Sequence, residues 1–246
     1  MTELFRAREC MGTVISVELG SGGSSTLLDE VFAWFDLVDA RFSTYKADSE
    51  VNRFDAGSLP LGDASADLRF VLSRCADLWS ETDGYFDAYA TGRLDPSGFV
   101  KGWSAQVASD RLLAAGVTDH CVNAGGDVRL RGHAPAGRPW RVGIRHPWNA
   151  QATCHVVEGT DLAVATSGVY ERGHHVIDPR RGRAASGLRS VTVVGPDLGT
   201  ADAYATAALA MGEGGVRWLA RLAGYAGVVV TDEGRKLTSR SLSSAA

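Results

Sequence analysis

Apolar residues recur along this chain with two different periods, and the period changes near residue 120. Before that point, several stretches have an apolar residue every three or four positions, which is the spacing of one helix face. The exception is the segment TVISVEL at residues 13–19, whose alternation predicts a half-buried strand. Residues 41–55 are polar and predict a solvated loop. The helical pattern predicts three helices, at about residues 26–40, 65–82 and 100–115.

Beyond residue 120, short apolar segments separated by turns rich in Gly, Pro, Asn and Asp predict a run of strands. A short Ala-rich helix at about 201–211 interrupts them and is expected to continue, after Gly214 and Gly215, through Val216 to Leu222. AGVVVTD with KLTSRS predicts a closing hairpin. Helices that precede the strands, rather than alternating with them, favour an α+β fold over a Rossmann domain. Without an internal repeat or a linker, we expect a single domain over residues 1–246.

Composition narrows the class of protein. The chain has 246 residues, of which 45% are hydrophobic, and its net charge of −4 gives no reason to expect a nucleic-acid partner. No apolar run approaches the roughly 20 residues of a membrane span, so we expect no stable membrane insertion. The first twelve residues lack the apolar core of a signal peptide, and the four cysteines form no CxxC pair. These features predict a cytoplasmic protein with reduced thiols.

The Ala-rich segment at residues 199–212 holds the strongest candidate for a metal site. Thr200 is the expected N-cap, and Asp202 is expected in the first turn, where the helix dipole favours a carboxylate. Asp202 and Thr206 are four residues apart, so their oxygens share one helix face. Oxygen ligands suit Mg²⁺, which completes its octahedron with water and substrate phosphates. Both residue types are also common on helices for stability alone, so the assignment depends on the rest of the chain.

Three further segments bear on chemistry. VNAGGD at residues 122–127 is not a dinucleotide fingerprint, because it lacks GxGxxG spacing and strand-like residues follow it. Its two glycines predict a bend where a ligand or another strand comes close. Ser167 lies in TSG without the elbow of a hydrolase nucleophile. His174 and His175 are adjacent, so on a strand only one of them faces a site, and residue chemistry alone does not choose between them.

Two other residues are suited to hold a flat ring or an anionic ligand. Lys101 opens the third predicted helix after a glycine, where backbone N–H groups and the helix dipole favour an anion. Tyr45 lies in the polar loop and is able to stack on a flat ring.

A series of short motifs runs in order through nearly the whole chain. They are MGT at 11–13, STY with DSE and Asn at 43–52, G-FD at 84–87, D-xx-G-xx-KG at 95–102, VNAGGD at 122–127, TSG at 166–168, H-x-IDP at 175–179 with Gly182, and AD-xx-AT at 201–206. The ordered series resembles the ApbE-type flavin transferases. That resemblance implies a T-fold-related α+β domain with a mixed or antiparallel sheet. It also implies a Mg²⁺-dependent FAD:protein FMN transferase, which splits the FAD pyrophosphate, joins FMN through a phosphoester to a Thr or Ser of an acceptor flavoprotein and releases AMP.

The same resemblance assigns roles to individual residues. Implied metal contacts are Asp202, Thr206 and a backbone oxygen of Gly98. The implied FAD contacts are Met11, Tyr45, Ala88, Asp95, Lys101 and Ile177, and the implied base is His175. The sequence does not choose between Mg²⁺ and Mn²⁺.

One segment departs from the family pattern. Longer members carry an insertion after G-FD, whereas here only AYATGRL separates Asp87 from Asp95. The pocket is therefore expected to be more open on that side. The chain resembles a short form without an export signal, so we expect its acceptors in the cytoplasm or on the cytoplasmic faces of membrane flavoproteins. Two alternatives share most of these residues: an FAD pyrophosphatase that releases FMN and AMP, and a carrier that binds FAD without turnover.

Overall fold

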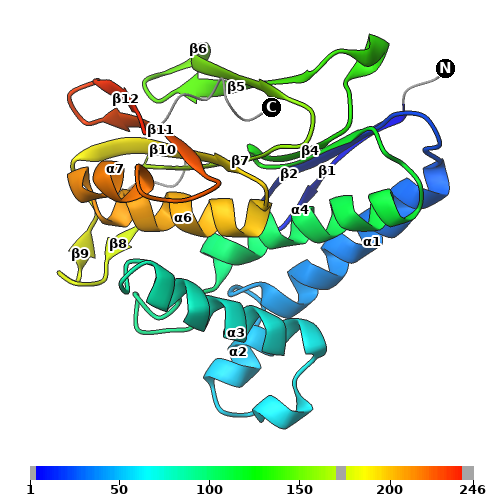
Figure 1. Ribbon diagram of the computed structural model, residues 1–246. Coiled ribbons are helices and arrows are strands. Elements are labelled where there is room, and N and C mark those ends of the chain that lie inside the picture. Colours follow the sequence, from blue (N-terminus) through cyan, green and yellow to red (C-terminus); the bar gives the residue numbers. More distant parts are fainter. Residues whose placement is uncertain (1–3, 170–175, 240–246) are drawn as a thin grey trace.

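The computed structural model describes residues 4–169 and 176–239, and within them an eight-stranded antiparallel sheet forms the centre of the fold (Figure 1). Its order is β1-β2-β3-β4-β7-β10-β11-β12. The strands are β1 Leu4–Cys10, β2 Thr13–Leu19, β3 His120–Ala124, β4 Asp127–Arg131, β7 Ala163–Gly168, β10 Leu188–Gly195, β11 Ala226–Thr231 and β12 Lys236–Thr238. The expected α+β class is confirmed, and of the two expected kinds of sheet, mixed or antiparallel, the structure has the antiparallel one.

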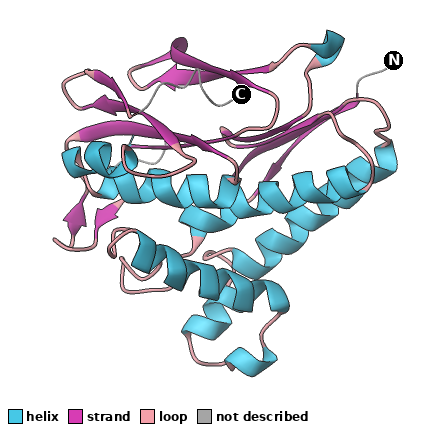
Figure 2. Ribbon diagram, viewed as in Figure 1, coloured by secondary structure: helices cyan, strands magenta, loops and turns pink. Residues whose placement is uncertain are grey.

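Helices cover one face of this sheet, and a separate hairpin covers the other (Figure 2). The hairpin pairs β5, Trp140–His146, with β6, Asn149–Gly159, and a small two-stranded sheet pairs β8, Ile177–Asp178, with β9, Arg183–Ala184. The α-helices are α1 Ser25–Phe42, α2 Glu50–Asp55, α3 Ala66–Glu81, α4 Ser97–Ala114, α6 Leu198–Ala210 and α7 Glu213–Leu219, and the short 3₁₀ turns are Leu61–Asp63 and Pro135–Gly137. The main core lies between sheet and helices, and a smaller core lies under the hairpin.

The amphipathic helices α1 and α3 form for the reasons that their sequences indicate. Ser24 caps α1 by accepting a hydrogen bond from the Leu27 N–H, and Ser65 caps α3 in the same way through Leu68. The buried face of α1 has the expected spacing, with Leu28, Val31, Phe32, Phe35 and Val38 in the core. The closing hairpin of β11 and β12 is also confirmed.

Two elements were not predicted from the pattern. Strand β1 lies at the edge of the sheet, where Arg6 and Arg8 pair with carboxylates of α1, so its polar residues hide its strand character. The segment predicted as a solvated loop, 41–55, contains the last residues of α1 and the short helix α2. Helix α2 buries only Val51, and Asn52 closes the preceding loop by donating to the Lys46 carbonyl at 2.8 Å. One buried side chain is too weak a signal for periodicity to detect.

The two helices that carry most candidate site residues begin earlier than expected. Helix α4 starts at Ser97 rather than about residue 100, since the Pro96 carbonyl already accepts the Val100 N–H at 3.0 Å. The Asp95 carboxylate also accepts the Ser97 N–H at 3.0 Å. In α6 the expected N-cap, Thr200, is wrong: Asp197 caps the helix by accepting the Thr200 N–H at 2.7 Å. Asp202 therefore lies in the second turn rather than the first.

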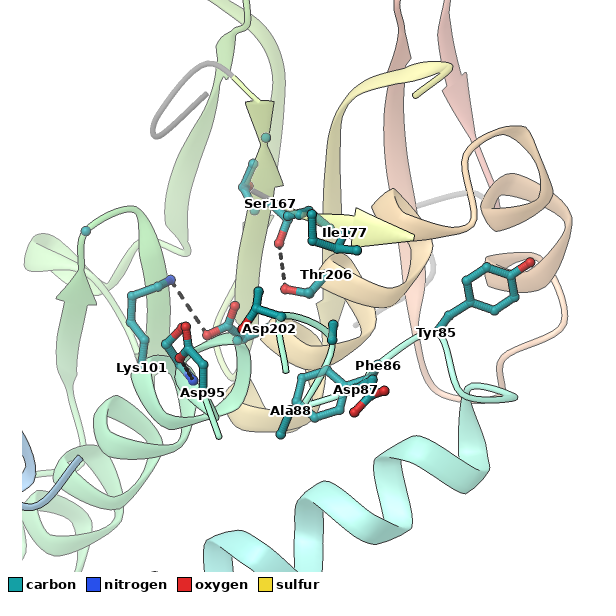
Figure 3. Close-up of a pocket in the computed structure, with 18 of the residues that line it drawn as sticks. Tyr85, Phe86, Asp87, Ala88, Asp95, Lys101, Ser167, Ile177, Asp202 and Thr206 are labelled. Atoms are coloured by element: carbon teal, nitrogen blue, oxygen red, sulfur yellow. Dashed lines mark hydrogen bonds and ion pairs between the residues drawn. The ribbon is translucent and has the colours of Figure 1, made fainter. Parts of the chain in front are cut away.

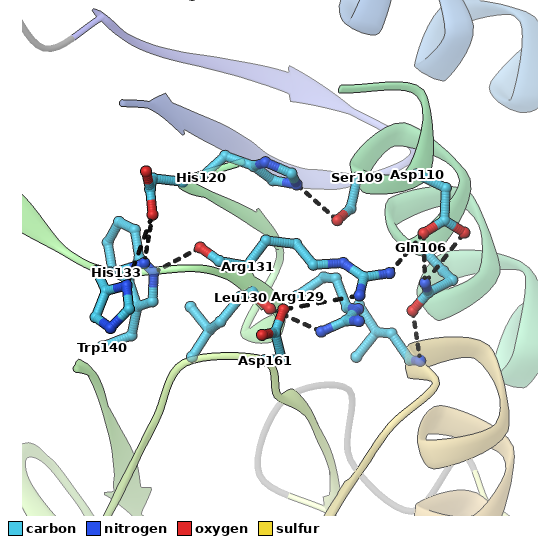
Figure 4. A network of polar contacts seen from close by, with 12 residues as sticks. Gln106, Ser109, Asp110, His120, Arg129, Leu130, Arg131, His133, Trp140 and Asp161 are labelled. Carbon is cyan, nitrogen blue, oxygen red and sulfur yellow. Dashed lines mark hydrogen bonds and ion pairs between the residues drawn. The ribbon is translucent and has the colours of Figure 1, made fainter. Parts of the chain in front are cut away.

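Hydrogen bonds and an ion pair connect the start of helix α6 to α4 and, through α4, to the sheet. Gln106 on α4 accepts the Leu198 N–H at 3.0 Å and donates to Asp110, which pairs with Arg131 of β4 (Figure 4). Small residues let the two helices approach, since a Cβ on Gly199 would lie 2.8 Å from the Phe99 ring. This packing aligns the inner faces of α4 and α6.

The Gly125–Gly126 pair was expected to mark a bend in a strand, and that expectation is corrected. The pair forms the tight turn between antiparallel β3 and β4, with φ of 62° and 98°. The close approach is present, because a Cβ on Gly125 would lie 2.3 Å from the Thr13 hydroxyl. Among the described residues, no helix combines the length and apolar character that crossing a membrane requires.

Candidate active site

A cavity of about 640 Å³ opens where the starts of α4 and α6 meet the end of β7 (Figure 3). Strand ends, helix starts and turns from distant parts of the chain form its walls. The described residues that line it are Gly12, Thr13, Tyr85, Phe86, Asp87, Ala88, Ala90, Thr91, Asp95, Ser97, Gly98, Lys101, Gly125, Arg145, Thr166, Ser167, Gly168, Val176, Ile177, Asp202 and Thr206.

Oxygen atoms gather on the wall formed by α6 and β7. Asp202 and Thr206 are one helical turn apart, and both line the cavity. The Thr206 hydroxyl lies 3.0 Å from the Ser167 hydroxyl in a hydrogen bond that joins α6 to β7. Gly98 packs against the same threonine, because a Cβ at this position would lie 3.3 Å from Thr206 Oγ1. The wall thus presents a carboxylate and two hydroxyls beside the backbone of the α4 start.

Lys101 is the cation of this wall, and it lies between two carboxylates. Its ammonium forms an ion pair with Asp127 and is 3.7 Å from Asp202 Oδ2. Asp127, the first residue of β4, is 1% exposed, and its other oxygen accepts the Thr166 N–H at 3.0 Å. Figure 3 shows the Lys101 and Asp202 side chains directed toward each other.

The segment that follows G-FD lines one side of the cavity. The Thr82 hydroxyl accepts the Phe86 N–H at 2.9 Å, which places the Phe86 ring against the core. The Asp95 N–H donates to the Ala88 carbonyl at 2.7 Å, so the segment between these two residues is closed into a compact loop. This short connection brings Ala88 and Asp95 together at the cavity wall.

The segment that carries Ile177 is held in place by contacts with the loop that follows α3. Arg180 donates to the Asp83 carbonyl at 2.7 Å, and its guanidinium lies 4.5 Å from the centre of the Tyr85 ring. Asp178 is buried and accepts from the backbone N–H of Arg180 at 3.0 Å. These contacts tie the β8–β9 hairpin to the loop after α3 and set Ile177 in the cavity wall.

The structure gathers most, but not all, of the residues that the sequence singled out. Met11 and Tyr45 do not line the cavity: Met11 lies in the β1–β2 turn beside Gly12, and Tyr45 is 95% exposed between α1 and α2. His174 and His175 lie outside the described residues, while Val176 and Ile177, which follow them, line the cavity. Those that do line it are Ala88, Asp95, Gly98, Lys101, Ile177, Asp202 and Thr206.

Several polar residues of this region received no role from the sequence, among them Ser167, Asp127 and Arg145. Ser167 and Asp127 belong to motifs that were noted, TSG and VNAGGD, but neither received a role. Arg145, at the end of β5, lines the cavity from the hairpin side. The motif positions were a usable signal for the first two residues, whereas the local sequence around Arg145 contains none.

The donor set determines which metals the site suits. Among the residues that the structure describes, no group of three or more His, Cys, Asp or Glu side chains is placed to hold a metal. The cavity instead offers one α6 carboxylate and hydroxyl oxygens, which suit a hard cation that keeps water or substrate ligands, such as Mg²⁺, rather than zinc. The lining also holds three carboxylates, of Asp87, Asp95 and Asp202, against the two cations Lys101 and Arg145.

Comparison with known proteins identifies the family. A model of the ApbE family matches residues 11–92 and 89–229. This chain belongs to the ApbE family. A relative from Vibrio cholerae named FAD:protein FMN transferase is 29% identical over 266 residues, covering 82% of this chain and 80% of the relative. An Escherichia coli protein of the same name is 27% identical over 277 residues, covering 86% of this chain and 78% of that relative.

The fold of the ApbE family is also matched by solved structures. The structure titled flavin transferase ApbE from Vibrio cholerae aligns with a TM-score of 0.85 at 25% identity and covers 98% of both chains. The family resemblance expected from the ordered motifs is therefore confirmed at the level of sequence and of fold.

Proposed function

We propose that this chain is an FAD:protein FMN transferase. The observation that carries the proposal is the meeting of α4 and α6 in one cavity, where Lys101 lies 3.7 Å from Asp202 Oδ2 and Thr206 lines the same wall. A lysine beside oxygen donors that suit a metal ion supplies the charge neutralisation on which phosphoryl transfer depends. Membership in the ApbE family and the names of the Vibrio cholerae and Escherichia coli relatives support this reaction.

Mg²⁺ fits the residues present. An FAD pyrophosphate is anionic, and the described lining carries more carboxylates than cations, so the cavity requires additional positive charge to bind it. Asp202, Thr206 and the Gly98 carbonyl are the residues that would hold the ion. When bound, Mg²⁺ supplies positive charge that neutralises the phosphate oxygens as the P–O bond breaks.

A backbone feature supports the Gly98 carbonyl as a donor. In a regular α-helix this carbonyl accepts the N–H of residue 102. The Gly102 N–H also donates to Asp202 Oδ2, at 3.0 Å. Because a carbonyl oxygen has two lone pairs, the Gly98 oxygen has capacity for a cation beside Thr206, and the shared N–H adds to that capacity.

The remaining roles follow from the position and chemistry of the side chains. Lys101 binds a phosphate oxygen, and the apolar Ile177 packs against a flat ring of FAD in the cavity. We propose His175 as the base, since an imidazole titrating near neutrality is able to take the proton of a Thr or Ser hydroxyl. As that hydroxyl oxygen bonds to the FMN phosphorus, the bond from phosphorus to the bridging oxygen breaks, and AMP leaves with that oxygen.

The test is to incubate the protein with FAD, MgCl₂ and an acceptor fragment that contains a candidate Thr or Ser, and to follow AMP release together with the intact mass of the acceptor. AMP release with an acceptor gain of one FMN supports the transferase. AMP release with an unchanged mass of a validated acceptor identifies an FAD pyrophosphatase instead. Intact bound FAD, with metal and a validated acceptor present, rejects both enzymes and leaves the carrier.

A further inference from the structure

Asp127 is a buried carboxylate that contacts Lys101, a residue of the cavity wall, without lining the cavity itself. It begins β4 directly after the Gly125–Gly126 turn, is 1% exposed and is not part of the cavity lining. One oxygen accepts the Thr166 N–H at 3.0 Å, and the other pairs with the Lys101 ammonium. A carboxylate this deeply buried is costly unless it is paired, so the ion pair and the burial depend on each other.

The ion pair with Asp127 determines where the Lys101 ammonium lies relative to Asp202. Lys101 Nζ contacts Asp127 but is 3.7 Å from Asp202 Oδ2, beyond hydrogen-bond distance. Asp202 is the carboxylate that the proposed function assigns to the metal. An ammonium that moved onto Asp202 would occupy the oxygen that a divalent cation requires and would add like-charge repulsion.

We infer that Asp127 is a positioning residue: it retains the Lys101 ammonium, so that Asp202 keeps its charge available for a divalent cation while Lys101 stays directed into the cavity. The inference rests on the proposed function, because it concerns the metal site of that reaction. Asp127, the last residue of VNAGGD, thus has a role in the site although it neither lines the cavity nor is one of the proposed metal donors.

A purely structural role is the alternative, because Asp127 also fixes Thr166 at the end of β7. The substitution Asp127→Asn separates the two roles. The asparagine side chain would retain an oxygen for the Thr166 N–H, whereas it has no charge with which to hold Lys101.

The experiment measures Mn²⁺ binding without FAD, by the loss of the free-ion signal in electron paramagnetic resonance. It compares the wild-type protein, Asp127→Asn, Lys101→Met and the double variant. We expect Asp127→Asn to weaken Mn²⁺ binding about tenfold. Lys101→Met should strengthen Mn²⁺ binding by a larger factor in the Asp127→Asn background than in the wild-type background, because in the wild type Asp127 already offsets the ammonium charge that lies 3.7 Å from Asp202.

The matched control is Asp87→Asn, which removes one carboxylate from the same cavity without touching Lys101. In that background, Lys101→Met should act as it does in the wild type. Lys101→Met could instead strengthen Mn²⁺ binding equally in the wild-type, Asp127→Asn and Asp87→Asn backgrounds. The Lys101 charge would then repel the ion regardless of Asp127, and the positioning role would be rejected. Failure of Lys101→Met to strengthen binding in the Asp127→Asn background leaves only the structural role. Absence of Mn²⁺ binding by the wild-type protein would overturn the proposed metal site itself, and the inference with it.

Discussion

The backbone N–H of Gly102 on α4 donates to the carboxylate of Asp202 on α6 at 3.0 Å, although the two residues are 100 positions apart in the chain. This bond requires the two helices to lie nearly in backbone contact. A Cβ on Gly102 would lie 2.5 Å from the Leu198 carbonyl oxygen and 2.8 Å from the Asp202 Cβ. Gly102 therefore sets both the spacing of the helices and the orientation of the acidic donor.

Gly102→Ala should disturb stability and chemistry together. The added methyl group meets backbone rather than a flexible side chain, so α4 and α6 must separate, at a cost of about 1–3 kcal/mol in the free energy of unfolding. The shift also moves Asp202 relative to Lys101. Urea unfolding and AMP release from FAD measure the two effects. Gly62→Ala is the control, because a Cβ there has nothing within 4 Å; equal behaviour of the two variants would contradict the packing argument.

Asp202→Asn should abolish turnover while leaving the fold intact. Asn retains an oxygen for the Gly102 N–H but removes the charge of the proposed metal donor. We expect AMP release from FAD to fall by at least about 100-fold, because a bound cation is worth several kcal/mol in the transition state. Circular dichroism checks the fold. Turnover close to that of the wild type would favour a site that works without this metal donor.

Thr206→Val should raise the Mg²⁺ concentration needed for half-maximal activity about tenfold or more, because the hydroxyl is a proposed donor and the Val shape is similar. The control is Thr192→Val, which removes a buried hydroxyl that is bonded to Thr166 at 2.8 Å and lies outside the cavity lining. That variant should lose stability without a change in the Mg²⁺ requirement. A parallel shift in both variants would assign the Thr206 effect to packing.

Arg145→Ala should raise the KM for FAD about tenfold, with a smaller change in kcat. Arg145 is one of two cations in the described cavity lining, and it comes from the hairpin rather than from the helices that hold the proposed metal donors. Its charge therefore contributes to anion binding more than to bond breaking. Arg141→Ala on the same strand is the control, since Arg141 pairs with Glu158 outside the cavity. An unchanged KM would contradict this role.

Local sequence predicted those parts of the site that one element contains. Asp202 and Thr206 are a helical turn apart, so the spacing alone placed their oxygens on one face. Their environment could not be predicted in this way, because Ser167 approaches Thr206 from β7 across 39 positions and Asp127 approaches Lys101 from β4. Such pairs depend on strand order and helix packing, which periodicity does not encode.

The same limit explains the errors in the fold. Periodicity found the long amphipathic helices, because each buries a full apolar face. It missed the start of α4, since Pro96 and Gly98 are typical of a turn, although the Pro96 carbonyl already accepts the first helical N–H, that of Val100. It also placed the N-cap of α6 at Thr200, because Asp197 and Thr200 both suit a cap and three-dimensional context chose the earlier residue.

His120 should make the stability of the fold depend on pH. It is fully buried, and burial lowers its pKa to about 4. Its Nδ1 is 2.9 Å from the Val117 carbonyl, which only accepts, so this nitrogen carries the proton and Nε2 accepts from the Ser109 hydroxyl at 2.7 Å. The native core therefore holds the neutral ring.

The sign follows from comparing the two states. An unfolded His has a pKa near 6.5, so below that pH the unfolded chain binds a proton that the native protein does not bind. The His120 contribution is complete above pH 6.5 and is lost as the pH falls toward 4, a change of about 3 kcal/mol. His120→Gln should therefore be less sensitive to pH than the wild type in urea unfolding between pH 7 and 4.5. His133→Gln, at a more exposed histidine, should follow the wild type; a constant difference between wild type and His120→Gln would show that the ring contributes packing alone.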